Sequence, residues 1–190
     1  REETLGTRHF FDTPFGRRLM VYADYTASGR GLTFVEEYLS ALMESYANTH
    51  TEDDVSGRSM SRMLHQAEAV IKAAVGGNAD TCVIPIGTGA TGAIQKLQEI
   101  LGVYVPPAAW EYLAERRGAE RPVVFIGAYE HHSNEVSWRE SLARVVRIGL
   151  ADRGALDLAE LERGLSDPRW RGCRKIGSFS AASNVTGLMT

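Results

Sequence analysis

The sequence predicts an α/β fold in which a mostly parallel sheet is covered by helices on both faces. In the second half of the chain, short apolar runs alternate with segments of helical periodicity, which is typical of such sheets. A glycine-rich turn at 87–94 lies between an apolar run and an amphipathic segment, as expected where a strand leads into a helix. The 190 residues are 44% hydrophobic, which is enough for the core of one ordinary domain.

The first half of the chain combines a polar arm with two expected helices. Residues 1–20 are polar with an aromatic cluster, and we expect them to form an arm laid across the domain. A short strand is expected at 21–25, running into a turn of small residues at 26–30. Apolar residues recur at helical spacing over 34–46 and again from about 60 to 71, where a following glycine pair predicts the end of the helix.

The second half supplies the expected sheet. Residues 82–86 form the strand expected before the glycine-rich turn, and a surface helix bounded by prolines is expected at 108–118. In sheets of this kind, ligands bind at the carboxyl ends of the strands. The remaining expected elements are strands at 123–128, 145–148 and 175–180, with helices around 136–143 and 157–164.

Charge and composition argue against several classes of partner. With 21 basic and 24 acidic side chains the net charge is -3, which offers no broad electrostatic surface for nucleic acid or an anionic membrane. The sequence shows no apolar run of about 18 residues and no secretory signal pattern, so we expect a cytoplasmic enzyme. Cys82 and Cys173 lack C-x-x-C spacing and are expected to be buried or incidental thiols.

The turn G-T-G-A-T-G-A-I at 87–94 is the first candidate binding site. A helix begins there with unpaired N–H groups and a positive dipole end, and glycines let an anion approach closely, so we expect a phosphate-bearing ligand. A tight turn without a ligand is the alternative. The dinucleotide fingerprint G-x-G-x-x-G also matches, but it requires an acid about 20 residues further on, and Glu130 lies too late. A P-loop is excluded because no Lys-Ser or Lys-Thr follows.

Polar segments follow two of the expected strands, Y-E-H-H-S-N at 129–134 and A-A-S-N-V-T-G at 181–187. A histidine there can stack on a planar ring or move protons near neutral pH, and an asparagine can bind a phenolate or carboxylate. Zinc is a rival at 130–132, but adjacent residues on an extended chain point in opposite directions and no H-E-x-x-H motif exists. The polar stretch 48–59 is a candidate active-site loop, with a solvated surface loop as the alternative.

Together these motifs resemble the class V branch of the fold type I pyridoxal-phosphate (PLP) enzymes, which includes cysteine desulfurases, selenocysteine lyases and several aminotransferases. The resemblance covers nearly the whole chain, from Y-A-D-Y-T-A-S at 22–28 through Y-A-N-T-H at 46–50 to the last residues. Each motif alone is modest, but all of them in this order are specific. The resemblance implies an amino-terminal arm at 1–20 and, at 21–190, the amino-terminal part of a PLP-binding large domain.

The resemblance also implies roles for individual residues. The segment G-A-T-G-A-I looks like the phosphate cup of the family, in which Ala90 and Thr91 would offer N–H groups, and Thr91 its hydroxyl, to the PLP phosphate. The segment E-H-H-S-N with Trp138 looks like the desulfurase type, in which the catalytic His131 would stack on the pyridine ring. Asn184 would lie near the O3′ of the cofactor and the substrate carboxylate. The substrate-binding residues implied are Ala27, Ser28, Asn48, His50 and Asn184.

The chain also departs from the family pattern. Gly92 stands where the family has a glutamate, so one contact to phosphate is lost. The family's Schiff-base lysine, the aspartate for the pyridine nitrogen, the arginine for the substrate carboxylate and the desulfurase cysteine are all expected beyond Thr190. The three lysines present lie in expected helices or at a strand start and do not fit the role. We therefore expect part of a longer PLP enzyme, with about half of the cofactor site and no activity by itself.

The activity implied is a reaction on an amino acid, by desulfuration, a related β-elimination or transamination, in a homodimer whose sites borrow residues from the neighbouring subunit. Two other classes stay open. A dinucleotide-binding oxidoreductase would explain the glycines but not the segments around His131 and Asn184. A non-catalytic fragment or interaction domain of the same fold would explain the missing lysine.

Overall fold

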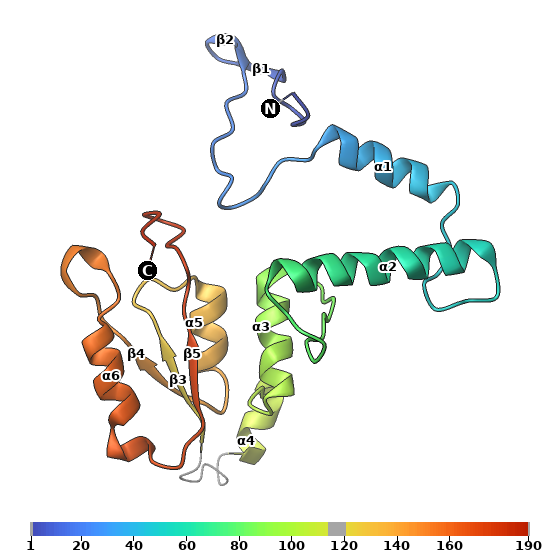
Figure 1. Cartoon of the computed structure of the whole chain (residues 1–190). Coiled ribbons are helices and arrows are strands. Elements are labelled where there is room, and N and C mark those ends of the chain that lie inside the picture. Colours follow the sequence, from blue (N-terminus) through green and yellow to red (C-terminus); the bar gives the residue numbers. More distant parts are fainter. Residues whose placement is uncertain (1, 114–120, 190) are drawn as a thin grey trace. The chain divides into compact units, whose positions relative to one another are not determined.

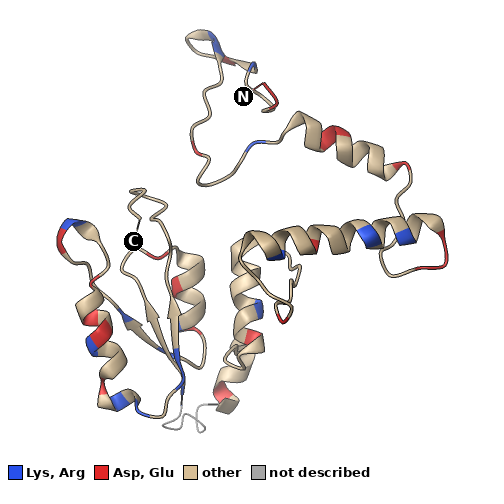
Figure 2. Cartoon of the chain, in the orientation of Figure 1, with Lys and Arg blue, Asp and Glu red and all other residues tan. Residues whose placement is uncertain are grey.

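The computed structural model describes residues 2–113 and 121–189 (Figure 1). The chain forms two compact units, one up to Ile84 and the other from Pro85 onward. Charges of both signs lie along helices of each unit (Figure 2). Among the described residues, no helix is both long and apolar enough to cross a bilayer. The predicted boundary between an arm at 1–20 and the rest of the chain stays a prediction.

The first unit begins with a hairpin. Strands β1 (Phe10–Thr13) and β2 (Gly16–Leu19) pair antiparallel around a two-residue turn, and Gly16 there has a φ of 89°. The strand predicted at 21–25 is wrong, because no ladder is formed at these residues. The Tyr22 hydroxyl instead donates to the carbonyls of Asp24 and Ser28, at 2.9 and 2.7 Å, and holds this segment in a turn.

Both helices predicted in this unit are present with shifted ends. Helix α1 (Thr33–Met43) ends three residues early and has no buried residue. Helix α2 (Val55–Ala74) begins five residues earlier than predicted, because Asp54 caps it by accepting a hydrogen bond from the Gly57 N–H at 2.7 Å. The glycine stop is confirmed, with Gly76 at a φ of 67°. The loop predicted at 48–59 is therefore shorter, since its last five residues are helical.

The second unit contains the predicted parallel sheet. Its strands are β3 (Val123–Ile126), β4 (Arg144–Arg147) and β5 (Lys175–Ser178), in the order β4-β3-β5. Both pairings are parallel, and Val123 is opposite Arg144 on one side and Lys175 on the other. The central strand β3 is buried throughout, which explains its uninterrupted apolar sequence. The predicted α/β class is confirmed.

Helices cover both faces of this sheet (Figure 1). Val124 and Ile126 face Trp138 of α5 (His132–Arg139) and Ile94 of α3 (Gly89–Ile100). The alternate side chains of β3 face the other way, where Leu161 of α6 (Leu158–Ser166) packs. A helix is predicted at 108–118. The structure has a 3-10 turn there (Pro107–Ala109), followed by α4 (Trp110–Leu113). The rest of the predicted helix lies outside the described residues.

The strand predicted at 82–86 is wrong. The segment forms no ladder, and Ile84 and Ile86 remain 53% and 45% exposed. Cys82 is also exposed, whereas Cys173 is partly buried against the second core cluster. An apolar run becomes a strand only when a neighbouring strand accepts and donates its hydrogen bonds, and the described residues supply none here.

Candidate functional site

Helices α3 and α5 run in the same direction. Near the carboxyl end of each helix, the Gln98 side chain of α3 donates to the Ser137 hydroxyl of α5 at 3.0 Å. Just past both helices, the Leu142 N–H donates to the Val103 carbonyl at 2.9 Å. Their amino-terminal ends therefore lie at the edge of the unit where the strands end (Figure 1). Two positive helix ends at this edge favour a negatively charged ligand.

The glycine-rich turn leaves the start of α3 open. Thr88 has φ 13° and ψ 65° and makes no side-chain cap, and Gly89 has a φ of 65°. Gly92 lies against the carbonyl of Gly87, where a Cβ would overlap the oxygen. The turn and the helix start at 87–94 are thus confirmed, while phosphate binding by Ala90 and Thr91 stays a prediction.

Gly92→Ala is expected to destabilise the second unit by about 1–3 kcal/mol, because the added methyl group would force the first turn of α3 apart. At an ordinary helix position the same change would stabilise by up to about 1 kcal/mol, so the sign is informative. Thermal unfolding followed by circular dichroism measures it. Gly87→Ala is the control, because a Cβ there meets open space and Tm should stay within about 2 °C. A Tm of Gly92→Ala equal to the wild-type value would contradict the close approach of Gly92 to the Gly87 carbonyl.

Glu130 connects the loops that follow β3 and β5. One carboxylate oxygen accepts from the N–H groups of Gly127 and Ser180, at 3.2 and 2.9 Å. The other accepts from the Ser180 hydroxyl at 2.6 Å and the Asn134 amide at 2.8 Å. Both oxygens are thus occupied. Within the described ranges, no group of three or more His, Cys, Asp or Glu could hold a metal ion.

A second network fixes α5 on the sheet. The indole N–H of Trp138, a residue with no exposed surface, donates to the Asn134 carbonyl oxygen at 3.0 Å and to the Ser178 hydroxyl at 3.1 Å. Asn134 in turn donates to the Ser178 carbonyl at 3.2 Å. Glu130, Asn134 and Trp138 of the E-H-H-S-N…W motif therefore have a structural role here. The sequence interpretation missed this role for Glu130 and Asn134, and it also missed their partner Ser178 of β5.

His131 caps α5. The helix begins four residues before the predicted start, because the His131 Nδ1 accepts a hydrogen bond from the Ser133 N–H at 3.2 Å and lies 2.8 Å from the Ser133 hydroxyl. Acceptance at Nδ1 places the proton of the neutral ring on Nε2. The His131 ring remains exposed, and His132 points in a different direction, with the ring planes 59° apart.

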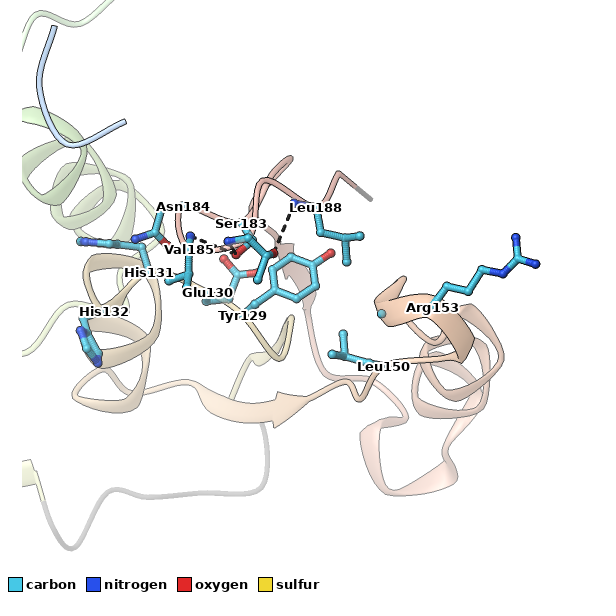
Figure 3. A pocket seen from close by; sticks show the side chains of 12 residues that line it. Tyr129, Glu130, His131, His132, Leu150, Arg153, Ser183, Asn184, Val185 and Leu188 are labelled. Carbon is cyan, nitrogen blue, oxygen red and sulfur yellow. Dashed lines mark hydrogen bonds between the residues drawn. The ribbon is translucent and has the colours of Figure 1, made fainter. Parts of the chain in front are cut away.

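A pocket of about 580 Å³ opens between the loops after β3, β4 and β5 (Figure 3). The loop after β5 is shaped by Ser183, whose hydroxyl accepts from the N–H groups of Val185 and Thr186 at 3.2 Å each. His131 and Asn184 both contribute to the wall. The lining residues are Tyr129, Glu130, His131, His132, Leu150, Arg153, Gly154, Ser183, Asn184, Val185, Thr186 and Leu188.

The other predicted site residues are distributed over both units. Ala90 and Thr91 lie in the first turn of α3, outside the lining of this pocket. The predicted substrate-binding residues of the first unit are exposed, and their roles stay predictions. They are Ala27, Ser28, Asn48 and His50.

Within the part of the chain that the structure describes, no lysine lines the pocket. Lys72 belongs to α2, in the other unit, and Lys175 begins β5, at the opposite end of the strand from the site. Lys96 pairs with Glu99 on α3, and its hydrogen bond lowers the pKa of that carboxyl. The expected position of the lysine for PLP beyond Thr190 stays a prediction.

The described residues define an α/β protein with an open pocket at the carboxyl edge of a parallel sheet.

The structure of this chain is similar to that of the cysteine desulfurase CsdA (S-sulfonic acid) from Escherichia coli, with a TM-score of 0.60 and 21% identity. CsdA is among 22 solved chains that match. The match covers 88% of this chain and 39% of CsdA, so the chain spans about two fifths of that protein. No protein-family model and no curated protein matches. At this identity the likeness shows the fold alone.

Proposed function

We propose that the chain is part of a PLP-dependent enzyme that acts on an amino acid, as a cysteine desulfurase or selenocysteine lyase-like enzyme or as an aminotransferase. The observation that carries the proposal is the pairing of His131 and Asn184 on one pocket, at the edge where α3 also begins. The fold likeness to a cysteine desulfurase supports it. A cytoplasmic homodimer belongs to the same proposal.

The residues present fit the phosphate and the ring of PLP. The first turn of α3 is exposed and uncapped, and Gly92 allows it to close tightly against Gly87, so the N–H groups of Ala90 and Thr91 are available to a phosphate. The His131 ring is exposed and its orientation is set by Ser133, which suits it to lie flat on a planar ring. The exposed Asn184 amide can donate to a phenolate or carboxylate oxygen.

PLP, when bound, supplies an electron sink for carbanion chemistry at the amino acid. His131 would hold the ring and offer a proton at Nε2, because Nδ1 is occupied by the Ser133 N–H. Asn184 would orient the substrate carboxylate. Glu130 takes no part in proton transfer in this scheme, since its four hydrogen bonds commit it to the two loops.

The test is a titration of the full chain with PLP, followed by equilibrium dialysis, with pyridoxal and NADH as comparison ligands. The proposal expects PLP to bind, pyridoxal to bind more weakly because it lacks the phosphate, and NADH not to bind. Borohydride reduction and peptide mapping should find no single lysine modified. Tight NADH binding without PLP uptake would favour a dinucleotide oxidoreductase, and binding of neither ligand would favour a non-catalytic interaction domain.

His131→Ala is expected to raise the Kd for PLP about tenfold, because the variant loses a stacked ring worth about 1.4 kcal/mol. His132→Ala is the matched control, since this neighbouring exposed histidine points in another direction, and its Kd should stay within about twofold of wild type. Equal losses in the two variants would contradict the assignment of His131.

A further inference from the structure

The Tyr129 hydroxyl is a buried polar atom without a partner. Among the described residues it is the one buried side-chain oxygen or nitrogen that makes no hydrogen bond. Leaving such a group unpaired costs about 1–3 kcal/mol, and buried polar groups in native proteins are nearly always paired. Tyr129 also lines the pocket, so a ligand there could supply the missing partner.

Tyr129 faces a part of the pocket that the proposed PLP contacts do not use. The side chains of Tyr129 and His131 leave their loop in opposite directions (Figure 3). On the Tyr129 side the wall has two apolar side chains, Leu150 from the loop after β4 and Leu188 from the loop after β5 (Figure 3). This part of the pocket therefore suits an apolar body with one polar group.

The polar groups near Tyr129 favour an anion. Arg153 lies at the rim of the pocket, and its side chain extends away from Tyr129 (Figure 3). Its backbone has the left-handed conformation, with a φ of 64°. The structure shows no ion pair for Arg153 within the described ranges. The one carboxylate of the lining, Glu130, already accepts four hydrogen bonds. The Tyr129 hydroxyl is a donor without an acceptor, Arg153 is a cation at the mouth of the pocket, and Glu130 accepts no further ligand. Together these groups favour a negatively charged ligand that accepts a hydrogen bond.

We propose that this part of the pocket binds a small organic acid with an apolar body. The body lies against Leu150 and Leu188, and the carboxylate accepts the hydrogen bond of the Tyr129 hydroxyl. Arg153 adds favourable potential at the mouth. The inference stands apart from the proposed function, because none of these residues is assigned to PLP.

The test uses 4-methylpentanoate as the probe and isothermal titration of the full chain. Acetate, which lacks the apolar body, and 4-methylpentanamide, which lacks the charge, are expected to bind at least tenfold more weakly. Tyr129→Phe should weaken binding of the probe about tenfold and yet raise the Tm of the free protein, because it removes an unpaired buried hydroxyl. Arg153→Gln should weaken binding about twofold, and salt should reduce this difference.

Tyr112→Phe is the matched control, since Tyr112 is 84% exposed on α4 and its change should alter neither binding nor Tm. Leu150→Trp, which fills the pocket, should abolish binding of the probe. The proposal is overturned if Tyr129→Phe binds the probe like wild type or lowers the Tm, or if the amide binds as tightly as the acid. PLP is titrated separately, so that loss of PLP binding with the probe retained counts against the proposed function alone.

Discussion

Glu130→Ala is expected to destabilise the second unit by about 3 kcal/mol and to weaken PLP binding. The change removes the acceptor of four hydrogen bonds that Gly127, Asn134 and Ser180 donate in a partly buried site. The loops after β3 and β5 would then lose their direct connection. Urea unfolding followed by tryptophan fluorescence measures the stability, and dialysis with PLP measures the site.

Two controls make this prediction specific. Glu130→Gln keeps the shape but turns one acceptor into a donor that faces other donors, so we expect a smaller loss of about 1–2 kcal/mol. Glu162→Ala removes an exposed carboxylate from α6 and should change the free energy of unfolding by less than about 0.5 kcal/mol. If Glu130→Ala behaves like Glu162→Ala, the carboxylate does not hold these loops together.

Trp138→Ala is expected to cost about 4 kcal/mol. The side chain is completely buried in the cluster that joins α3 and α5 to the sheet, and truncation would leave a large cavity as well as removing two hydrogen bonds. Because α5 carries His131 at its start, the loss should also weaken PLP binding. Circular dichroism at increasing urea is the suitable measurement, since the mutation removes a fluorescent residue.

Trp138→Phe separates the two contributions. It keeps most of the apolar contact and loses the indole N–H, while Asn134 and Ser178 still bond to one another, so we expect a cost of about 1–2 kcal/mol. Val136→Ala, at a position 46% exposed on the same helix, should change stability by less than about 0.5 kcal/mol. A loss for Trp138→Ala below about 1 kcal/mol would contradict the core position of this residue.

The helices and the three parallel strands were largely predictable because their signals are local. Apolar periodicity indicated α1 and α6, and uninterrupted apolar residues indicated β3. The start of α5 was not predictable in this way, since histidine is not among the usual capping residues, and the His131 Nδ1 takes that role here. The strands predicted at 21–25 and 82–86 were wrong, because a strand depends on a neighbour that local sequence does not specify.

The candidate site was predictable in part. His131 and Asn184 were placed at strand ends, and the carboxyl ends of parallel neighbours meet at one edge, so their shared pocket confirms that placement. Their functional roles stay predictions. The role of Glu130 was missed because its partners Ser180 and Gly127 are ordinary loop residues with no motif of their own.

By itself the sequence determined the α/β class, the order of the main elements and the residue types that follow each strand, because these depend on periodicity and on turn chemistry within a few residues. Only the tertiary structure decided that Glu130 and Ser180, 50 residues apart, share hydrogen bonds, and that the Tyr129 hydroxyl has none. The physical reason is the register of β3 against β5, which sets the two loops at one level. Whether a buried donor finds an acceptor depends on the distance between the two loops in space and not on the residues beside the donor in the chain.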